Sequence, residues 1–456
     1  MKKDYQVDMG RGPIAKVVLS LALPAMISML FQNLYALIDT MFISNLGAFP
    51  LAAQSLAVPL FYLALSVGKG VQVGTASLIS QARGQGKNEE VNIKATAALP
   101  LLLILMLLLF PLLIPSAGIS FFKMLGASAD VCGHAYNYTF WLILGFPVMS
   151  YVMIAEAISM SHGNTVTPMK SMIIGNCLNA VLNPFFMFSL GMGIAGSSLA
   201  TLIGQLVSAF YMRSKLKKYG LVTPAIRFNS TTLIQWKQIG SLGFFVAITL
   251  LISPLGLSLL NGVLASLGAA AVGAWNIMSR LEMLGLLPLY GMASALIPFM
   301  AYNYGRKNFG RVQEGVRFSL IFSFIFILPV IAIFIFLPHY LMFPFRAGNE
   351  VRQLGIQAIR LAAFGHLFIP VEIALYSSAQ GLKRPWYLLA AIVFRMLFAR
   401  YPLAILFAVN WGINGVYWCQ PASMGISVLL SAALLARLLR QARKDLNYGH
   451  TASIKA

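Results

Sequence analysis

One carboxylate stands in a stretch that is otherwise apolar enough to cross a lipid bilayer. It is Asp39, within the segment Phe31 to Gly47, and no lysine or arginine occurs between Lys16 and Lys69. A charged side chain deep in a membrane costs about 2.5–3.5 kcal/mol on insertion scales, so such a group usually faces a bundle interior or a water-filled cavity. This setting predicts a site for a cation or a proton. The alternative is an aspartate that only hydrogen-bonds a neighbouring helix.

The composition indicates an integral membrane protein. Of the 456 residues, 59% are hydrophobic and 10% are charged, whereas a soluble domain carries roughly 25% charged residues. The formal charge of +21 does not indicate nucleic-acid binding, because Lys and Arg occur in short blocks between apolar runs. Three scattered cysteines (Cys132, Cys177 and Cys419) predict neither a disulfide framework nor a metal site. No nucleophile motif or His/Asp cluster occurs, so an enzyme is not expected.

Hydropathy predicts an all-α integral membrane protein with twelve transmembrane helices. The predicted spans are residues 17–46, 50–81, 92–116, 135–161, 169–190, 194–216, 237–266, 270–303, 314–338, 353–379, 386–409 and 413–437. The basic opening segment precedes an apolar run too long for a signal peptide, so the first span is expected to stay uncleaved. On this map the external loops hold only Lys123, Arg346 and Arg352 among the basic residues. This asymmetry predicts that both termini are cytoplasmic.

The chain divides into two related halves. At one constant offset, Gly47 aligns with Gly268, and the same offset aligns Gly70 with Gly291. We expect an N-terminal six-helix bundle (1–213), a basic cytoplasmic linker (214–236), a C-terminal six-helix bundle (237–440) and a cytoplasmic tail (441–456). Both halves run from the cytoplasm back to the cytoplasm, so the repeat is parallel. Two pseudo-symmetric bundles then face a central cleft, which suits alternating access.

Several segments resemble the multidrug and toxin extrusion (MATE) transporter family, in particular its DNA-damage-inducible-protein-like (DinF-like) branch. They are LALPAMISMLFQNLYALIDTMFISNLG, LAAQSLAVP, ISQARGQGKNEE, GNCLNAVLNPFFMFSLGMGIAGSSLATLIGQ and RLEMLGLLPLYGMASALIPFMAYNYGRKNFGRV. The resemblance covers essentially the whole chain. It implies a secondary antiporter that exports small organic, mostly cationic or amphipathic compounds, driven by inward H⁺ or Na⁺ and without a cofactor. We expect a monomer in the lipid bilayer of a bacterial or archaeal cell (inner) membrane.

The same resemblance assigns the coupling site to the N-terminal bundle. Carried over residue by residue, the site consists of Asp39, Asn179, Asn183 and Thr201. Tyr35 lies one helical turn before Asp39 and can donate its phenol. The residues themselves favour this grouping, because Asn179 and Asn183 share one helix face and buried amides need partners. The alternative is that the two asparagines only hold helices together.

At Asn183 the sequence departs from the branch, which often has a second carboxylate there. One acid instead of two leaves less negative charge for Na⁺, a hard cation that favours several oxygen ligands including carboxylates. The departure favours H⁺ carried by Asp39, without excluding Na⁺ bound at Asp39.

The C-terminal half lacks an equivalent acid. The repeat places Leu260 opposite Asp39, and the predicted span 237–266 contains no carboxylate. Buried charges are usually paired, so the other intramembrane acids are expected either in ion pairs or, in the C-terminal half, lining the substrate cavity. The residues concerned are Glu156, Glu282 and Glu372, with Arg395 as a further candidate for the cavity. For Glu156, near the cytoplasmic end of its span, simple solvation is the alternative. The arginines available to pair with Glu372 are Arg360, Arg395 and Arg400.

The sequence allows two readings of Pro24 and offers an alternative transport function. Pro24 lies inside the first span, where proline removes a backbone hydrogen bond, so it is a candidate hinge or else a static kink. A flippase of lipid-linked saccharides, from the same superfamily, is the alternative function, because Arg280, Arg395 and Arg400 are compatible with a pyrophosphate group. The major facilitator class also has twelve spans, but its loop motif is absent from the ARGQGKNEE segment.

Overall fold

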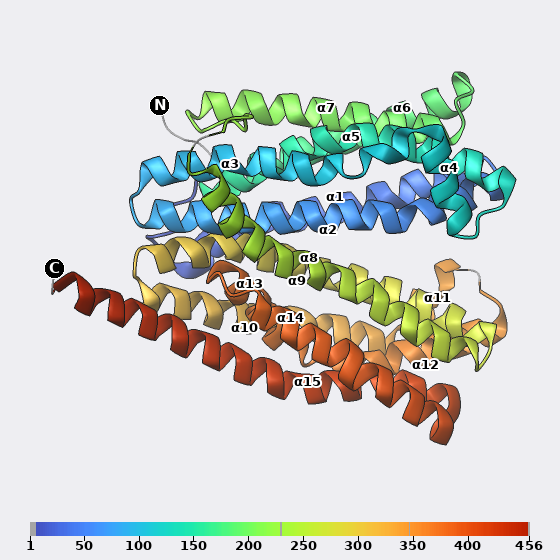
Figure 1. The fold of residues 1–456 in the computed structure, drawn as a ribbon. Helices are drawn as coiled ribbons and strands as arrows, with labels where there is room; N and C mark the ends of the chain where they lie inside the picture. Colours follow the sequence, from blue (N-terminus) through green and yellow to red (C-terminus); the bar gives the residue numbers. More distant parts are fainter. Residues whose placement is uncertain (1–5, 229, 346, 455–456) are drawn as a thin grey trace.

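The computed structural model describes residues 6–228, 230–345 and 347–454, which are almost entirely helical (Figure 1). A bilayer requires every backbone polar group to be paired within its own segment, which favours helices in so apolar a chain. The first half contains α1 (Ile14–Ser44), α2 (Ala48–Gly84), α3 (Asn88–Leu107), α4 (Pro115–Met124), α5 (Ala129–Ser161), α6 (Val166–Pro184) and α7 (Ile194–Lys218). The second half contains α8 (Thr232–Ala265), α9 (Ala269–Gly305), α10 (Phe309–Phe336), α11 (Pro338–Met342), α12 (Asn349–His366), α13 (Ile369–Gly381), α14 (Trp386–Val393) and α15 (Tyr401–Ile454).

Four short segments complete the helical structure. Two are 3-10 turns, η1 (Phe110–Leu113) and η3 (Phe343–Phe345). The other two are π-helical, η2 (Phe185–Ser189) and η4 (Phe394–Arg400). Each π-helical segment directly follows the corresponding helix of its half, α6 or α14.

The helices fit the predicted membrane fold. Among the described residues, ten helices are long and apolar enough to cross a membrane, and α12 with α13 forms a further span bent by 57° at its break. One of the ten is the long run Trp386–Leu446. It contains Gly412, with φ 60° and ψ −141°, and so joins the two spans predicted at 386–409 and 413–437. The expected all-α membrane architecture is therefore confirmed.

Some predicted boundaries are wrong, and prolines explain two of them. The span predicted at 92–116 ends at Leu107, because Pro111 in the first turn of η1 and Pro115 at the start of α4 lack a backbone donor. The span predicted at 353–379 breaks after His366, and Pro370 is the second residue of α13. The last helix, α15, continues beyond the predicted span 413–437 to Ile454.

The two halves lie side by side, and both chain termini are at the same end of the molecule (Figure 1). We call this the terminus-bearing end, and the opposite one the far end. Between the halves, α2 packs closely on α8, because a side chain at Gly70 would place its Cβ 2.4 Å from the carbonyl oxygen of Gly243. Small residues of this kind let membrane helices approach closely. Nearer the terminus-bearing end, Ser77 Oγ donates to the carbonyl of Gln380 at 3.0 Å.

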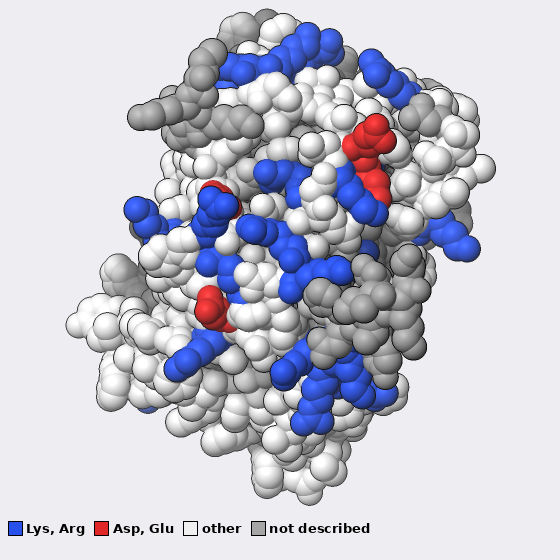
Figure 2. All heavy atoms as spheres, turned by 90° about the vertical axis from the view of Figure 1, so that its left-hand side faces the viewer, with Lys and Arg blue, Asp and Glu red and all other residues white. Residues whose placement is uncertain are grey.

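The segment before α1 connects the halves at the terminus-bearing end. The Val7 amide donates to the Gly163 carbonyl in the first half at 3.0 Å. Asn303 of α9 donates its Nδ2 to the Met9 carbonyl at 3.0 Å, and Arg311 of α10 donates to the Gly12 carbonyl at 2.9 Å. Figure 2 shows this end of the molecule, where Lys and Arg side chains gather and Asp and Glu are few.

Candidate functional site

Asp39 lies in the part of α1 nearest the far end, and its side chain is buried at 6% exposure. Its Oδ1 accepts hydrogen bonds from Asn183 Nδ2 at 2.9 Å and from Ser197 Oγ at 2.5 Å. Its Oδ2 accepts a longer bond from Gln54 Nε2 at 3.2 Å. The carboxylate is thus surrounded by neutral donors from α2, α6 and α7.

A chain of hydrogen bonds extends from Asp39 through the other predicted residues. Asn183 Nδ2 also donates to Asn179 Oδ1 at 3.1 Å, and Asn179 Nδ2 donates to Thr201 Oγ1 at 3.0 Å. The hydroxyls of Tyr35 and Thr201 are 2.9 Å apart. The structure therefore brings all five residues of the predicted coupling site into one network.

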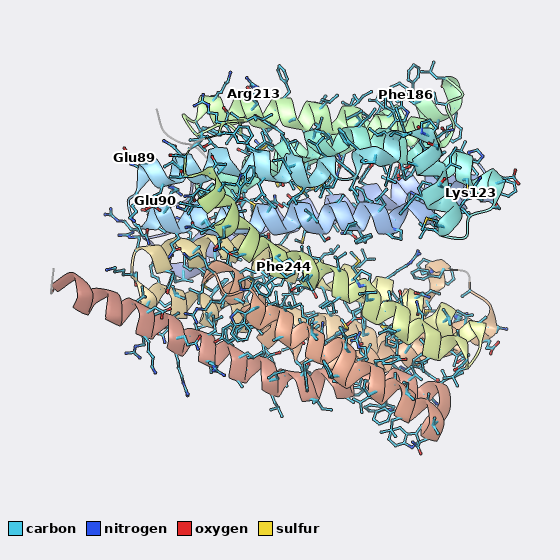
Figure 3. All side chains as sticks on the ribbon, in the orientation of Figure 1. Glu89, Glu90, Lys123, Phe186, Arg213 and Phe244 are labelled. Atoms are coloured by element: carbon cyan, nitrogen blue, oxygen red, sulfur yellow. The ribbon has the colours of Figure 1, made fainter. Side chains whose placement is uncertain are left out.

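Local sequence explains why these side chains meet. Asn179 and Asn183 lie one turn apart at the end of α6, directly before the π-helical η2. The chain then reverses through Gly193, whose φ is 56°, and starts α7. Figure 3 labels Phe186 of η2 and Lys123 near the far end, and Glu89, Glu90 and Arg213 near the terminus-bearing end. The network accordingly lies toward the far end of the first half.

The sequence prediction missed Ser197 and Gln54. Ser197 precedes Thr201 by one helical turn on α7, so the i,i+4 rule that paired the asparagines could also have identified it. Gln54 comes from α2, and its contact with Asp39 depends on how α1 and α2 pack. No spacing in the sequence indicates that contact.

The donor set suits a proton or a single cation. Among the described residues, no three or more His, Cys, Asp or Glu side chains cluster to hold a metal ion. The oxygen Asn183 Oδ1 is buried and has no hydrogen-bond partner in this part of the chain. It can therefore act as a further oxygen ligand beside the carboxylate, as Na⁺ requires. Alternatively, Asp39 can carry a proton while its neighbours hold it in place.

The second half holds a different polar cluster. Glu282 of α9 accepts hydrogen bonds from Gln420 Nε2 at 2.8 Å and His366 Nε2 at 3.2 Å. Glu372 of α13 forms an ion pair with Arg395 of η4. Arg280, although close to Glu282 in sequence, is exposed. Of the candidate cavity residues, Glu372 and Arg395 therefore bind each other, and Glu282 is bound by His366 and Gln420 of the same half.

Glu156 and Pro24 lie apart from both clusters. Gln72 Nε2 donates to Glu156 Oε2 at 2.8 Å, and Lys69 Nζ donates to Gln72 Oε1 at 2.9 Å. The glutamine thus links the acid to a lysine within α2. Pro24 lies inside the continuous helix α1, and its carbonyl accepts a hydrogen bond from Ser28 Oγ at 2.9 Å.

Two helical halves with a buried polar network are typical of membrane transporters built from repeats. The sequence pattern of the MatE family matches residues 24–185 and 246–406, one segment in each half. The chain therefore belongs to the MatE family of multidrug and toxin extrusion transporters. It is accordingly a transporter and not an enzyme.

Named relatives and solved structures agree with this family. The chain is 26% identical to a FAD transporter of Shewanella oneidensis over 447 residues, which cover 95% of this chain and 97% of the relative. It is 25% identical to the multidrug export protein MepA of Staphylococcus aureus over 462 residues, covering 96% and 97%. A multidrug resistance MATE family transporter solved in an outward-facing conformation superimposes with a TM-score of 0.89 at 26% identity, covering 96% and 99%. A MATE structure in the bent conformation gives 0.88 at 25% identity, covering 96% and 98%.

Proposed function

We propose that this chain is a secondary antiporter that exports small organic compounds, driven by H⁺ that enters through Asp39. The observation that carries the proposal is the buried carboxylate with three neutral donors and no cation among its hydrogen-bond partners. A structural carboxylate of this depth would be expected to have a basic partner. A carboxylate that must alternate between a proton and a negative charge needs neighbours that tolerate both states.

Relatives support the class of substrate. MepA is a multidrug export protein, and the Shewanella oneidensis relative is a FAD transporter. Both relatives transport a small organic compound, and we propose the same for this chain. Cationic or amphipathic drugs are the first candidates. Within this proposal the protein acts as a monomer, and Tyr35, Asn179, Asn183 and Thr201 set the affinity of the Asp39 site.

The basic face supports an orientation in the cell (inner) membrane with both termini on the cytoplasmic side, since Lys and Arg favour that side.

The close contacts between the halves lie in the terminus-bearing part of the molecule, at Gly70 with Gly243 and at Ser77 with Gln380. Together with the similarity to an outward-facing transporter, this supports a state closed toward the cytoplasm. Alternating access would move the bundles 1–213 and 237–440 against each other, with 214–236 as their linker and Pro24 as the bending point of α1.

Transport by purified protein in liposomes tests the proposal. An imposed pH gradient should drive ethidium accumulation by the unmodified protein, and Asp39→Asn should abolish that accumulation. Asp130→Asn is the matched control, because Asp130 is an exposed aspartate in the first turn of α5. Normal accumulation by Asp39→Asn would refute the role of Asp39. Accumulation driven by a Na⁺ gradient alone would replace H⁺ by Na⁺ as the coupling ion.

A further inference from the structure

The polar cluster of the second half occupies the position that the coupling network occupies in the first. At a single sequence offset, Gly193 and Thr201 of the first half correspond to Gly412 and Gln420 of the second half. Both glycines have positive φ. The π-helical η4 follows α14 as η2 follows α6. Segments of this kind occur frequently at functional sites. The second half therefore repeats the framework of the coupling site with different side chains.

Arg400, the last residue of η4, has no carboxylate partner. It is buried at 9% exposure, and its Nη1 donates to the Met396 sulfur at 3.6 Å. Among the described residues, its Nε finds no hydrogen-bond acceptor. Within the described part of the chain, Arg400 forms no ion pair, whereas Arg395 is paired with Glu372.

The titratable groups that act electrostatically on Arg400 come from four elements, and both carboxylates among them are already engaged. They are Arg395 on the same segment, Glu282 on α9, Glu372 on α13 and Cys419 on α15. Glu282 accepts from His366 and Gln420, and Glu372 is held by Arg395. Two arginines and two glutamates balance in charge, but the Arg400 Nε donor remains without an acceptor among the described residues.

A buried guanidinium without an acceptor is costly, because its desolvation is not offset by hydrogen bonds. Its planar fork of N–H groups matches the two oxygens of a carboxylate or phosphate group. A surface hollow borders the segment, lined by Leu255, Ser258, Leu259, Gly262, Val263 and Tyr401. Tyr401 follows Arg400 directly, and a Cβ at Gly256 of α8 would lie 3.1 Å from the Met396 sulfur. The hollow thus lies between α8 and the start of α15, where Tyr401 is the chain neighbour of Arg400.

We propose that Arg400, supported by Arg395, binds the carboxylate or phosphate group of an organic anion inside the second half. The inference rests on the proposed function, because the bound anion would be a transported compound or a lipid headgroup that accompanies transport. It extends the expected substrates from cations to compounds that carry an acidic group. Glu282 and Glu372 then orient the cluster through His366, Gln420 and Arg395.

Binding to the purified full-length protein in a neutral detergent tests the site by calorimetry. The probes are benzoate, phenyl phosphate and dihexanoyl phosphatidic acid, with benzyltrimethylammonium as a cation of similar size. We expect saturable binding of one anion per protein, not displaced by the cation. Tighter binding of phosphatidic acid than of phenyl phosphate would identify a lipid headgroup as the source of the acidic group. Tighter binding of phenyl phosphate would identify a soluble compound as its source.

Three variants locate the binding. Arg400→Gln should weaken anion affinity at least about tenfold, the order expected for losing a charge-assisted hydrogen bond. Arg400→Lys should weaken it less, because it keeps the charge but loses the fork. Arg360→Gln, a control at an exposed arginine of α12, should leave it unchanged.

Absence of saturable anion binding by the unmodified protein would overturn the proposal, and so would equal affinity in folded Arg400→Gln. If Arg400→Gln does not yield folded protein, Arg400→Lys decides: unchanged affinity for both benzoate and phenyl phosphate would overturn binding by a guanidinium fork. The measurement uses no ion gradient. Its failure is therefore distinct from a failure of coupled transport at Asp39.

Discussion

The two halves place a buried polar cluster at equivalent points of one repeated framework, but they fill it with opposite chemistry. In the first half a single acid, Asp39, is held by amides and hydroxyls. In the second half the repeat counterpart of Asp39 is the buried Leu260, and arginines and glutamates form the cluster. On the two proposals made above, the duplicated fold divides its tasks: the first bundle handles the ion, and the second binds the organic compound.

Coupling between such separated sites requires a shared conformational change. A ligand shifts an equilibrium only through its differential affinity for the two states. Proton and substrate must therefore favour opposite arrangements of the two bundles. The main helix pairs that join the halves are α2 with α8, α2 with α9 and α1 with α9, and through them each cluster can influence the other.

The largest expected effect comes from breaking the ion pair in the second half. Arg395→Gln leaves Glu372 without its cation, and loss of one partner of a buried pair costs about 3–5 kcal/mol of unfolding free energy. Denaturant unfolding of the purified protein measures this. The double variant Arg395→Gln/Glu372→Gln should recover most of the loss, because neither charge is then unpaired. Equal stability of the single variant and the unmodified protein would show that the pair does not organise this cluster.

A second acid in the first half should change the coupling ion. Asn183→Asp places a carboxylate beside Asp39, and Na⁺ favours anionic oxygen ligands. We expect the dependence of transport on Na⁺ to increase by about tenfold, on the order of one charge-assisted interaction. Transport in liposomes over a series of Na⁺ concentrations measures the change. An identical Na⁺ response before and after the substitution would contradict our account of Asn183.

Removing the charge of Glu372 should alter substrate preference more than ion dependence. Glu372→Gln releases Arg395 from its ion pair, so the second half becomes more favourable to anions and less favourable to cations. We expect a roughly threefold shift in the ratio of anion to cation transport, on the order of one partly screened charge. Export of ethidium and of an anionic dye under the same pH gradient measures it. Loss of proton coupling with unchanged preference would move the ion site to the second half.

The smallest expected effect concerns the bending of α1. Pro24→Ala restores a backbone donor and can straighten the helix without removing a ligand of Asp39. Substrate binding should persist while turnover falls, by a factor of about two to five if bending limits the cycle. Turnover in liposomes and affinity in detergent separate the two quantities. Unchanged turnover would identify Pro24 as a static kink.

The sequence predicted the polar residues on α1, α6 and α7 better than the contact that α2 makes with them. Asn179 and Asn183 share a helix face, and their relation to Asp39 and Thr201 came from the family resemblance; all four meet in the structure. Gln54 was missed because its contact depends on the packing of α1 against α2.

In the second half, the partner of Glu372 could not be chosen among Arg360, Arg395 and Arg400. Only tertiary placement decides this, since Arg360 proves to be exposed. Hydropathy likewise located the span at 353–379 without its 57° bend, because apolar residues continue through the break at Leu367 and Phe368.

Proton release on substrate binding tests the central claim most directly. Ethidium is added to purified protein in a weakly buffered detergent solution, and a pH-indicator dye records any protons released. We expect release by the unmodified protein and by the Asp130→Asn control, and none by Asp39→Asn that still binds ethidium. Equal proton release by Asp39→Asn and the unmodified protein would contradict the assignment of Asp39 as the coupling group.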